Sequence, residues 1–294
     1  MSQFTKKPAY KKGIHTITRM SKVCVEVSAP YAGESTYYYA LMSDVHFDNA
    51  HTNLKMFTDD LKKVQDRQGL AFIFGDFFCM MQGKQDRRSS KSAIRPEHMT
   101  GSYLTDVVGS AEDLLMPYLD SIAMISDGNH ETSLVNRYEF DPIKTLCGNF
   151  MRRGMHLEHM PYCGWVWLRY EHKSGGAIRK QKLFYHHEFY SGTITKGALS
   201  VNRSAAMAYD ADIFVSGHTH DKFIIPHGTY RLMDNGEQII QTQMHVKAGT
   251  YKDEFSDGSG FAVEKVKQPK PLGSVELELT VNKDGFRKKT SITV

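Results

Sequence analysis

The stretch that determines the fold is YYYALMSDVH, residues 37–46. Its first six residues are apolar or aromatic, as in a buried β-strand, and this pattern stops at Ser43. Asp44 and His46 follow two positions apart, so in extended backbone both side chains point to the same side. The stretch therefore predicts a short buried strand with a polar end.

Four further predicted strands end in the same way. They cover 70–74, 122–125, 182–185 and 212–215, and they lead into Gly75-Asp76, Asn129-His130-Glu131, His186-His187 and His218-Thr219-His220. Between the strands lie helical patterns over about 54–64 and 104–119, and weaker ones over 136–152 and 198–209. Strands alternating with helices predict a layered α/β sheet, whose ligand site forms beyond the carboxyl ends of the strands.

The two ends of the chain have a different pattern. Valines alternate at 23, 25 and 27, and apolar residues alternate over 275–281, which predicts half-exposed antiparallel strands packed on the same core. Residues 249–274 are rich in Gly, Asp, Lys and Pro and predict a long loop. We therefore expect a single domain over 1–294, with a basic N-terminal segment at 1–13 and a C-terminal loop and β-hairpin at 249–294.

Composition excludes several classes of protein. The 294 residues are 40% hydrophobic and 24% charged, which is ordinary globular usage and excludes a disordered chain or a small disulfide scaffold. No apolar run approaches the ~18 residues that cross a bilayer, and the start MSQFTKK leads into lysine rather than a signal core. The four cysteines form no close pair and are expected to be reduced thiols. We expect a soluble, cytoplasmic protein with no membrane partner.

The polar residues at the five strand ends are metal ligands in type. Taken singly, each has a structural explanation, such as a cap, a turn or a core histidine, but all fall at one edge of the predicted sheet. They comprise two carboxylates, one amide oxygen and four imidazoles: Asp44, His46, Asp76, Asn129, His218, His220 and either His186 or His187. We prefer His186, because it follows its strand directly, and keep His187 as the alternative. So many donors suit two metal ions, and nitrogen and oxygen ligation without thiolate suits Mn²⁺, Fe, Zn²⁺ or Ni²⁺.

In this order, the blocks Asp44-x-His46, Gly75-Asp76, Gly128-Asn129-His130-Glu131, His186 and Gly217-His218-x-His220 resemble the signature blocks of the calcineurin-like metallophosphoesterases. The resemblance covers about residues 37–221, and the segments 75–97 and 129–133 also resemble phage-encoded members. It implies a four-layer α/β/β/α sandwich with the metal site at the carboxyl ends of the strands.

The resemblance also implies a role for each residue. Asp44, His46 and His220 would hold one metal, Asn129, His186 and His218 the other, and Asp76 would bridge the two. His130 would face the scissile phosphate rather than bind a metal. Cys79 stands where the family usually has a further, supporting aspartate, so we expect the site to survive with an altered orientation of its surroundings.

These expectations define a reaction. Two divalent cations, with Mn²⁺ as the preferred choice, lower the pKa of a bridging water toward ~7 and supply hydroxide for in-line attack on phosphorus. His130 then helps to stabilise the charge that develops on the phosphoryl and leaving oxygens. We expect a metal-dependent phosphoric ester hydrolase that cleaves a phosphodiester and needs no nucleophilic side chain.

The substrate expectation depends on charge. The net charge is +4, and a basic stretch directly follows the expected bridging aspartate, where it would overhang the metals; its members expected to bind substrate phosphates are Arg87, Arg88, Lys91 and Arg95. This favours a nucleic acid, and hence a nuclease. A phosphodiesterase of small cyclic or dinucleotides is the alternative, as is a solvated loop of no special function. A catalytically silent phosphate-binding module is a further alternative, although such copies normally lose ligands and all positions are filled here.

Overall fold

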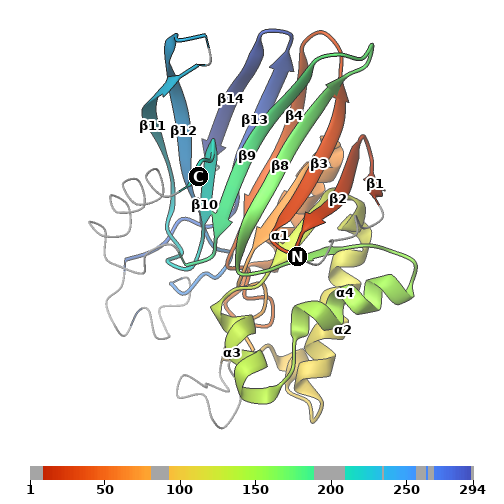
Figure 1. Cartoon of the computed structure of the whole chain (residues 1–294). Coiled ribbons are helices and arrows are strands. Elements are labelled where there is room, and N and C mark those ends of the chain that lie inside the picture. The colour runs from red at the N-terminus through yellow and green to blue at the C-terminus, as the bar shows by residue number, and fades with distance from the viewer. Residues whose placement is uncertain are drawn as a thin grey trace.

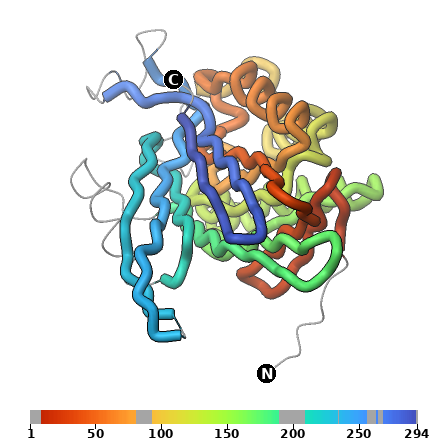
Figure 2. Tube along the Cα trace, turned by 90° about the horizontal axis from the view of Figure 1, so that it is seen from above, coloured from red at the N-terminus to blue at the C-terminus, as the bar shows by residue number. Residues whose placement is uncertain are grey.

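The structure, a computed structural model, describes residues 9–80, 93–188, 209–233, 235–255, 263 and 268–292. Two β-sheets stack face to face, and helices cover the outer face of one of them (Figure 1). Seen from above, the C-terminal residues 275–292 (dark blue) lie next to residues 222–232 and 238–248 (light blue) (Figure 2). None of the described helices is long and apolar enough to span a bilayer.

The six-stranded sheet contains three of the five predicted strands. Its order is β14-β13-β4-β5-β6-β7, with β4 to β7 parallel and the β13–β14 hairpin antiparallel at the edge. The strands are β4 (Ser35–Met42), β5 (Leu70–Phe74), β6 (Ile122–Ser126), β7 (Glu158–Met160), β13 (Val275–Asn282) and β14 (Gly285–Ile292). The C-terminal hairpin therefore extends the sheet that β4 begins.

The eight-stranded sheet contains the other two. Its order is β1-β2-β3-β8-β9-β10-β12-β11, and β10 pairs in parallel with both β9 and β12. The strands are β1 (Tyr10–Lys12), β2 (His15–Ser21), β3 (Cys24–Tyr31), β8 (Cys163–His172), β9 (Ile178–His186), β10 (Ile213–Ser216), β11 (Lys222–Leu232) and β12 (Gln238–Ala248). The five strands with polar ends thus divide between two sheets, instead of lying in the single sheet that alternation alone predicts.

A continuous apolar core fills the space between the sheets. It includes Leu41 and Phe72 from the six-stranded sheet and Leu168 and Leu183 from the eight-stranded one, all fully buried. Burial of such side chains stabilises the fold by about 1.5–3 kcal/mol each. The core therefore holds the carboxyl ends of strands from both sheets in fixed relation.

Helices cover the outer face of the six-stranded sheet. They are α1 (Leu54–Asp66), α2 (Tyr103–Leu115), α3 (Asn129–Tyr138) and α4 (Pro142–Arg152), with short 3₁₀ turns η2 (Pro96–His98) and η3 (Met116–Ser121). The Asn53 side chain accepts the Met56 N–H at 3.0 Å and caps α1, whose buried face carries Phe57, Leu61 and Val64. This apolar face is the pattern that predicts the helix over 54–64.

The α/β class and the stacked-sheet architecture are confirmed. The weak helical pattern over 136–152 spans the end of α3 and the whole of α4. The first of these helices begins earlier than predicted, at Asn129, shortly after β6. The predicted helix over 198–209 lies outside the described residues apart from Tyr209. Tyr209 packs on a small cluster of Phe184, Ala211 and Phe214 on the eight-stranded sheet.

Candidate metal centre

Both sheets contribute side chains to one cluster at the carboxyl ends of their strands. Asp44 and His46 follow β4, Asp76 follows β5, and Asn129 opens α3 just after β6. The eight-stranded sheet adds His187 after β9 and His218 and His220 after β10, so the cluster joins the two sheets.

One group of donors consists of Asp44, His46 and His220. The Nε2 atoms of the two histidines lie 3.1 Å apart, and Asp44 Oδ1 lies 3.5 Å from His220 Nε2 and 3.9 Å from His46 Nε2. Burial lowers the pKa of His46 well below its usual value, and the charges of His130 and His220 lower it further. Burial and the Lys252 charge lower the pKa of His220 to about 3. Two neutral imidazoles therefore face one carboxylate oxygen.

The second group consists of Asp76, His187 and His218, joined by Asn129. His187 Nε2 lies 3.1 Å from Asp76 Oδ2 and 3.1 Å from Asn129 Oδ1, and His218 Nδ1 lies 2.7 Å from the same amide oxygen. His187 Nδ1 donates to the Phe74 carbonyl at 2.9 Å, so once the ring loses its second proton it presents the lone pair of Nε2 to the cluster. Such a second hydrogen bond is typical of metal-binding histidines.

The donors fit divalent cations. Among the described residues nothing donates a hydrogen bond to Asp44 Oδ1, although this oxygen is fully buried. Burial and the charge of Asp76 raise the pKa of Asp44 to about 6. At His187 the charges of Asp76 and Asp44 outweigh burial, which acts in the opposite direction, and raise the pKa to about 9. A bound cation would compensate a buried carboxylate oxygen that no described group donates to and that lies among imidazole nitrogens.

The backbone at the donors adopts a conformation that side chains usually avoid. Five of them have φ between 48° and 67°: Asp44, His46, Asp76, His218 and His220. This left-handed region costs about 1–2 kcal/mol for a residue other than glycine. Hydrogen bonds between the loops hold it in place, since Asp44 N donates to Gly75 O at 3.1 Å and His218 N donates to Asp44 Oδ2 at 2.9 Å.

Two glycines allow the loops to approach closely. A Cβ atom at Gly217 would lie 2.0 Å from Ser43 Oγ and 2.4 Å from Asp44 Oδ2. A Cβ atom at Gly128 would lie 2.2 Å from both the backbone N and Oδ1 of Asp76. Both sites are tighter than any real Cβ contact, so only glycine fits between these strand ends.

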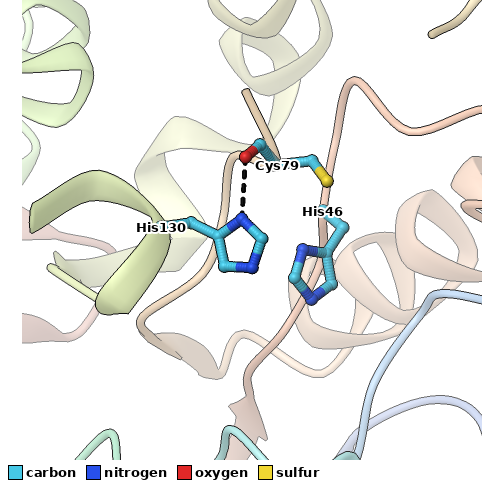
Figure 3. A group of neighbouring side chains, drawn as sticks. All are labelled: His46, Cys79 and His130. Atoms are coloured by element: carbon cyan, nitrogen blue, oxygen red, sulfur yellow. Dashed lines mark hydrogen bonds between the residues drawn. The ribbon is translucent and has the colours of Figure 1, made fainter. Parts of the chain in front are cut away.

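His130 lies beside the cluster and not inside it. Its Nδ1 donates to the Cys79 carbonyl at 2.7 Å, and its ring packs on His46 with centroids 4.8 Å apart (Figure 3). His130 Nε2 lies 3.8 Å from Asp76 Oδ2. Burial lowers the pKa of His130, but the charge of Asp76 and the hydrogen bond to Cys79 outweigh it and raise the pKa to about 10. This position suits a group that faces substrate next to the metals.

Two buried carboxylates outside the donor set hold the loops. Glu131 accepts the backbone N–H groups of Asp76, Phe78 and Gly128, at 3.2, 2.9 and 2.8 Å. Asp48 accepts those of Cys79 and Met80. Both carboxylates thus support the loops through hydrogen bonds to the backbone.

The preference for His186 over His187 is wrong in this structure. His187 is fully buried and approaches Asp76 and Asn129, whereas His186 packs edge-to-face against Tyr162 outside both donor groups. The reason is strand phase: position 187 continues the side of β9 that carries Leu183 and Tyr185 into the core, and position 186 continues the opposite side.

Arg95 does not take the role expected of it. Its guanidinium donates to the Phe47 and Thr52 carbonyls at 3.1 and 2.6 Å, so it braces the turn after the first donor pair. The other expected substrate contacts, Arg87, Arg88 and Lys91, lie outside the described residues.

Sequence reasoning overlooked a support behind the site. Lys247, fully buried on β12, donates through Nζ to the Gly217 carbonyl at 3.0 Å. Thr250, from the predicted loop, donates to the Asp44 carbonyl at 2.8 Å. The available signal for Lys247 was its place between the apolar residues Val246 and Ala248 at the end of the strand, while nothing in the sequence marked Thr250.

No protein-family model and no curated protein sequence matches the chain. Solved structures that align with it include a predicted phosphoesterase from Streptococcus pneumoniae, with 12% identity, 87% of this chain and 89% of that one covered, and a TM-score of 0.34. Vacuolar Protein Sorting 29 from Cryptosporidium parvum aligns with 12% identity, 87% and 97% coverage and a TM-score of 0.40. A metallophosphoesterase from Sphaerobacter thermophilus aligns with 14% identity, 87% coverage of both chains and a TM-score of 0.38. At these low values, the similarity of the chain to calcineurin-like metallophosphoesterases rests on its five sequence blocks and on the side chains that they bring together.

Proposed function

We propose that this protein is a metal-dependent phosphodiesterase that binds two divalent cations and cleaves nucleic acid. The observation that carries the proposal is the convergence of Asp44, His46, Asp76, Asn129, His187, His218 and His220 from two sheets into two adjoining donor groups. One structural metal would need only four of these ligands. Donor groups that together exceed one site are typical of two-metal hydrolases.

Bound divalent cations would activate water and neutralise the charge of a phosphoryl group. The chain's own residues orient the reaction. His130, held through Nδ1 by the Cys79 carbonyl, presents Nε2 beside Asp76, where it can donate a hydrogen bond to a phosphoryl or leaving oxygen. Ser43 is fully buried, and its hydroxyl donates to the Phe74 carbonyl at 2.7 Å rather than to a basic side chain, so it is not arranged as a nucleophile. Attack by water is therefore the route that these residues support.

The choice of nucleic acid as the substrate rests on charge in the sequence. Lys84, Arg87, Arg88 and Lys91 follow the second donor block closely and would provide several phosphate contacts. Arg95 is excluded from this set because its guanidinium is bonded to backbone carbonyls. A small cyclic or dinucleotide substrate would need fewer cations, and it is the outcome to expect if these four residues prove unimportant.

The test combines metal analysis with a substrate screen. The protein, reconstituted with Mn²⁺, Fe²⁺, Zn²⁺ or Ni²⁺, is assayed against bis-p-nitrophenyl phosphate, p-nitrophenyl phosphate, DNA, RNA and cyclic nucleotides. We expect close to two ions per chain and diester cleavage that a chelator abolishes. A stoichiometry of zero or one would overturn the two-metal arrangement. Metal binding without any hydrolysis would overturn the proposed activity in favour of a phosphate-binding module.

A further inference from the structure

His130 is held by a peptide group rather than by a side chain. Its Nδ1 lies 2.7 Å from the Cys79 carbonyl oxygen, and because a carbonyl can only accept, Nδ1 carries the proton (Figure 3). The Cys79 sulfur lies 3.5 Å from the Asn49 side-chain nitrogen and within 4.8 Å of ring nitrogens of His46 and His130, but the hydrogen bond to His130 Nδ1 comes from the Cys79 carbonyl. The backbone of position 79 therefore orients the His130 ring.

The same peptide group is bonded on its other side to a buried carboxylate. The N–H of Met80 belongs to the peptide whose carbonyl comes from Cys79, and it donates to Asp48 Oδ2 at 2.9 Å. Asp48 Oδ1 accepts the preceding N–H, from Cys79, at 2.7 Å. Asp48 is 2% exposed, so water competes little for its oxygens. The Asp48 carboxylate, the Cys79–Met80 peptide and the His130 imidazole thus form one continuous chain of hydrogen bonds, the Asp48–His130 relay.

We propose that Asp48 is a positioning residue for His130 and acts through the Cys79–Met80 peptide group. A carboxylate that accepts the N–H of a peptide polarises it, and its carbonyl then accepts more strongly from the imidazole. Asp48 also fixes the backbone at this point, where Met80 has φ 39°, a conformation with an intrinsic cost. The arrangement is a carboxylate–histidine pair with one peptide group inserted.

Helix α2 anchors this relay. The Tyr103 hydroxyl, in its first turn, donates to Asp48 Oδ2 at 2.5 Å. Asp48 therefore accepts three hydrogen bonds, two from the backbone and one from Tyr103. An asparagine cannot accept all three, because its amide nitrogen only donates.

The inference rests on the proposed function, and its test compares Asp48→Asn with a matched control. Asp60 also accepts a tyrosine hydroxyl, from Tyr251 at 2.7 Å, and a backbone N–H, from Ser274 at 3.1 Å, but has no link to His130. With bis-p-nitrophenyl phosphate and full metal occupancy, we expect Asp48→Asn to lower kcat about 10- to 100-fold with little change in KM. Tyr103→Phe should give a smaller loss in the same direction, and Asp60→Asn should leave kcat unchanged.

A double-mutant cycle separates positioning from general loss of structure. In a His130→Ala background, Asp48→Asn should cost no further activity, because the group that it positions is gone. An equal loss in both backgrounds would overturn the proposal. A second readout needs no metal and no turnover: the His130 Nδ1–H proton should resist exchange with water in the wild type and in Asp60→Asn, and exchange faster in Asp48→Asn.

These readouts distinguish the two proposals. If the wild type hydrolyses no phosphoester, the proposed function fails, and the exchange measurement still decides the relay. If the wild type is active and Asp48→Asn matches it in both kcat and proton exchange, the relay is wrong and the proposed function stands.

Discussion

Asp76 and His130 lie close together, yet their replacement should have different effects on metal binding and on activity. Asp76 is 2% exposed and belongs to the second donor group, where its Oδ2 lies 3.1 Å from His187 Nε2. Asp76→Asn should therefore lose both metal binding and activity. His130→Ala should keep the metals and lose about 10²- to 10⁴-fold in kcat, as expected for a positioned acid or electrostatic group. Elemental analysis and initial rates on the same samples provide the check, and an emptied metal site in His130→Ala would contradict its assignment.

The pKa of His187 predicts how the metal-free protein responds to pH. In the folded chain this pKa is raised from 6.5 to about 9, mainly by Asp76 and Asp44 acting against burial. The protonated form is thus favoured by folding, and its stabilising contribution is complete below pH 6.5 and is lost as the pH rises through 9. Thermal unfolding of the metal-free protein should show this decline, and His187→Gln should remove it.

Metal binding should have the opposite pH dependence. A histidine must lose its proton to bind a cation, so metal affinity should rise by up to about tenfold per pH unit between 6.5 and 9. Competition with a fluorescent chelator measures the affinity, and calorimetry in buffers of different ionisation enthalpy counts the protons released. An affinity that is flat over this range would mean that His187 binds no metal.

The error at His186 shows what residue types and spacing do and do not specify. The donors Asp44, His46, Asp76, Asn129, His218 and His220 were all expected, because carboxylates, imidazoles and amides rarely follow so many buried strands for purely structural reasons. Choosing between two adjacent histidines needed the phase of β9, which the inward positions Leu183 and Tyr185 do contain. Backbone acceptors such as the Cys79 carbonyl leave no sequence signature at all, which is why the support of His130 was not predicted.

At the scale of elements, the strand-end loops depend on contact distances that no pattern of polarity reveals. Gly217→Ala should empty the metal centre, since its Cβ would collide with Ser43 and Asp44. Gly109→Ala is the matched control: Gly109 lies inside α2, and a Cβ there meets nothing within 4 Å. The control should be neutral or stabilise the fold by about 0.5–1 kcal/mol, because alanine favours a helix over glycine. Metal content and urea unfolding of both variants give the comparison, and a Gly217→Ala protein with full metal content would show that the loops can separate.

At the scale of the whole molecule, the apolar core between the two sheets contains a buried pair of hydrogen-bonded tyrosine hydroxyls. Tyr39 of β4 and Tyr170 of β8 are fully buried, and their hydroxyl oxygens lie 2.8 Å apart. Tyr39→Phe should cost about 1–3 kcal/mol, because it leaves the Tyr170 hydroxyl without this partner. The double replacement with Tyr170→Phe should recover much of that loss, since no orphaned hydroxyl remains. Urea denaturation tests this, and a double variant with the summed loss of both singles would contradict the pairing.

The two-sheet architecture was only partly accessible from the sequence. Alternation of strands and helices predicts a layered α/β protein, but not that β4, β5 and β6 lie in one sheet while β9 and β10 lie in another. Sheet membership is set by long-range pairing, such as β13 with β4, between segments more than 200 residues apart. Local propensity carries no information about such partners, and here only the family resemblance predicted the second sheet.

The division of the donors between two sheets has a consequence for how the protein is made. The donors run from Asp44 to His220, so no short fragment contains a complete set, and a nascent chain cannot use metal to nucleate a local turn. The complete donor set could hold cations only after both sheets have docked. Bound cations would then stabilise the folded state and slow its unfolding without speeding its folding.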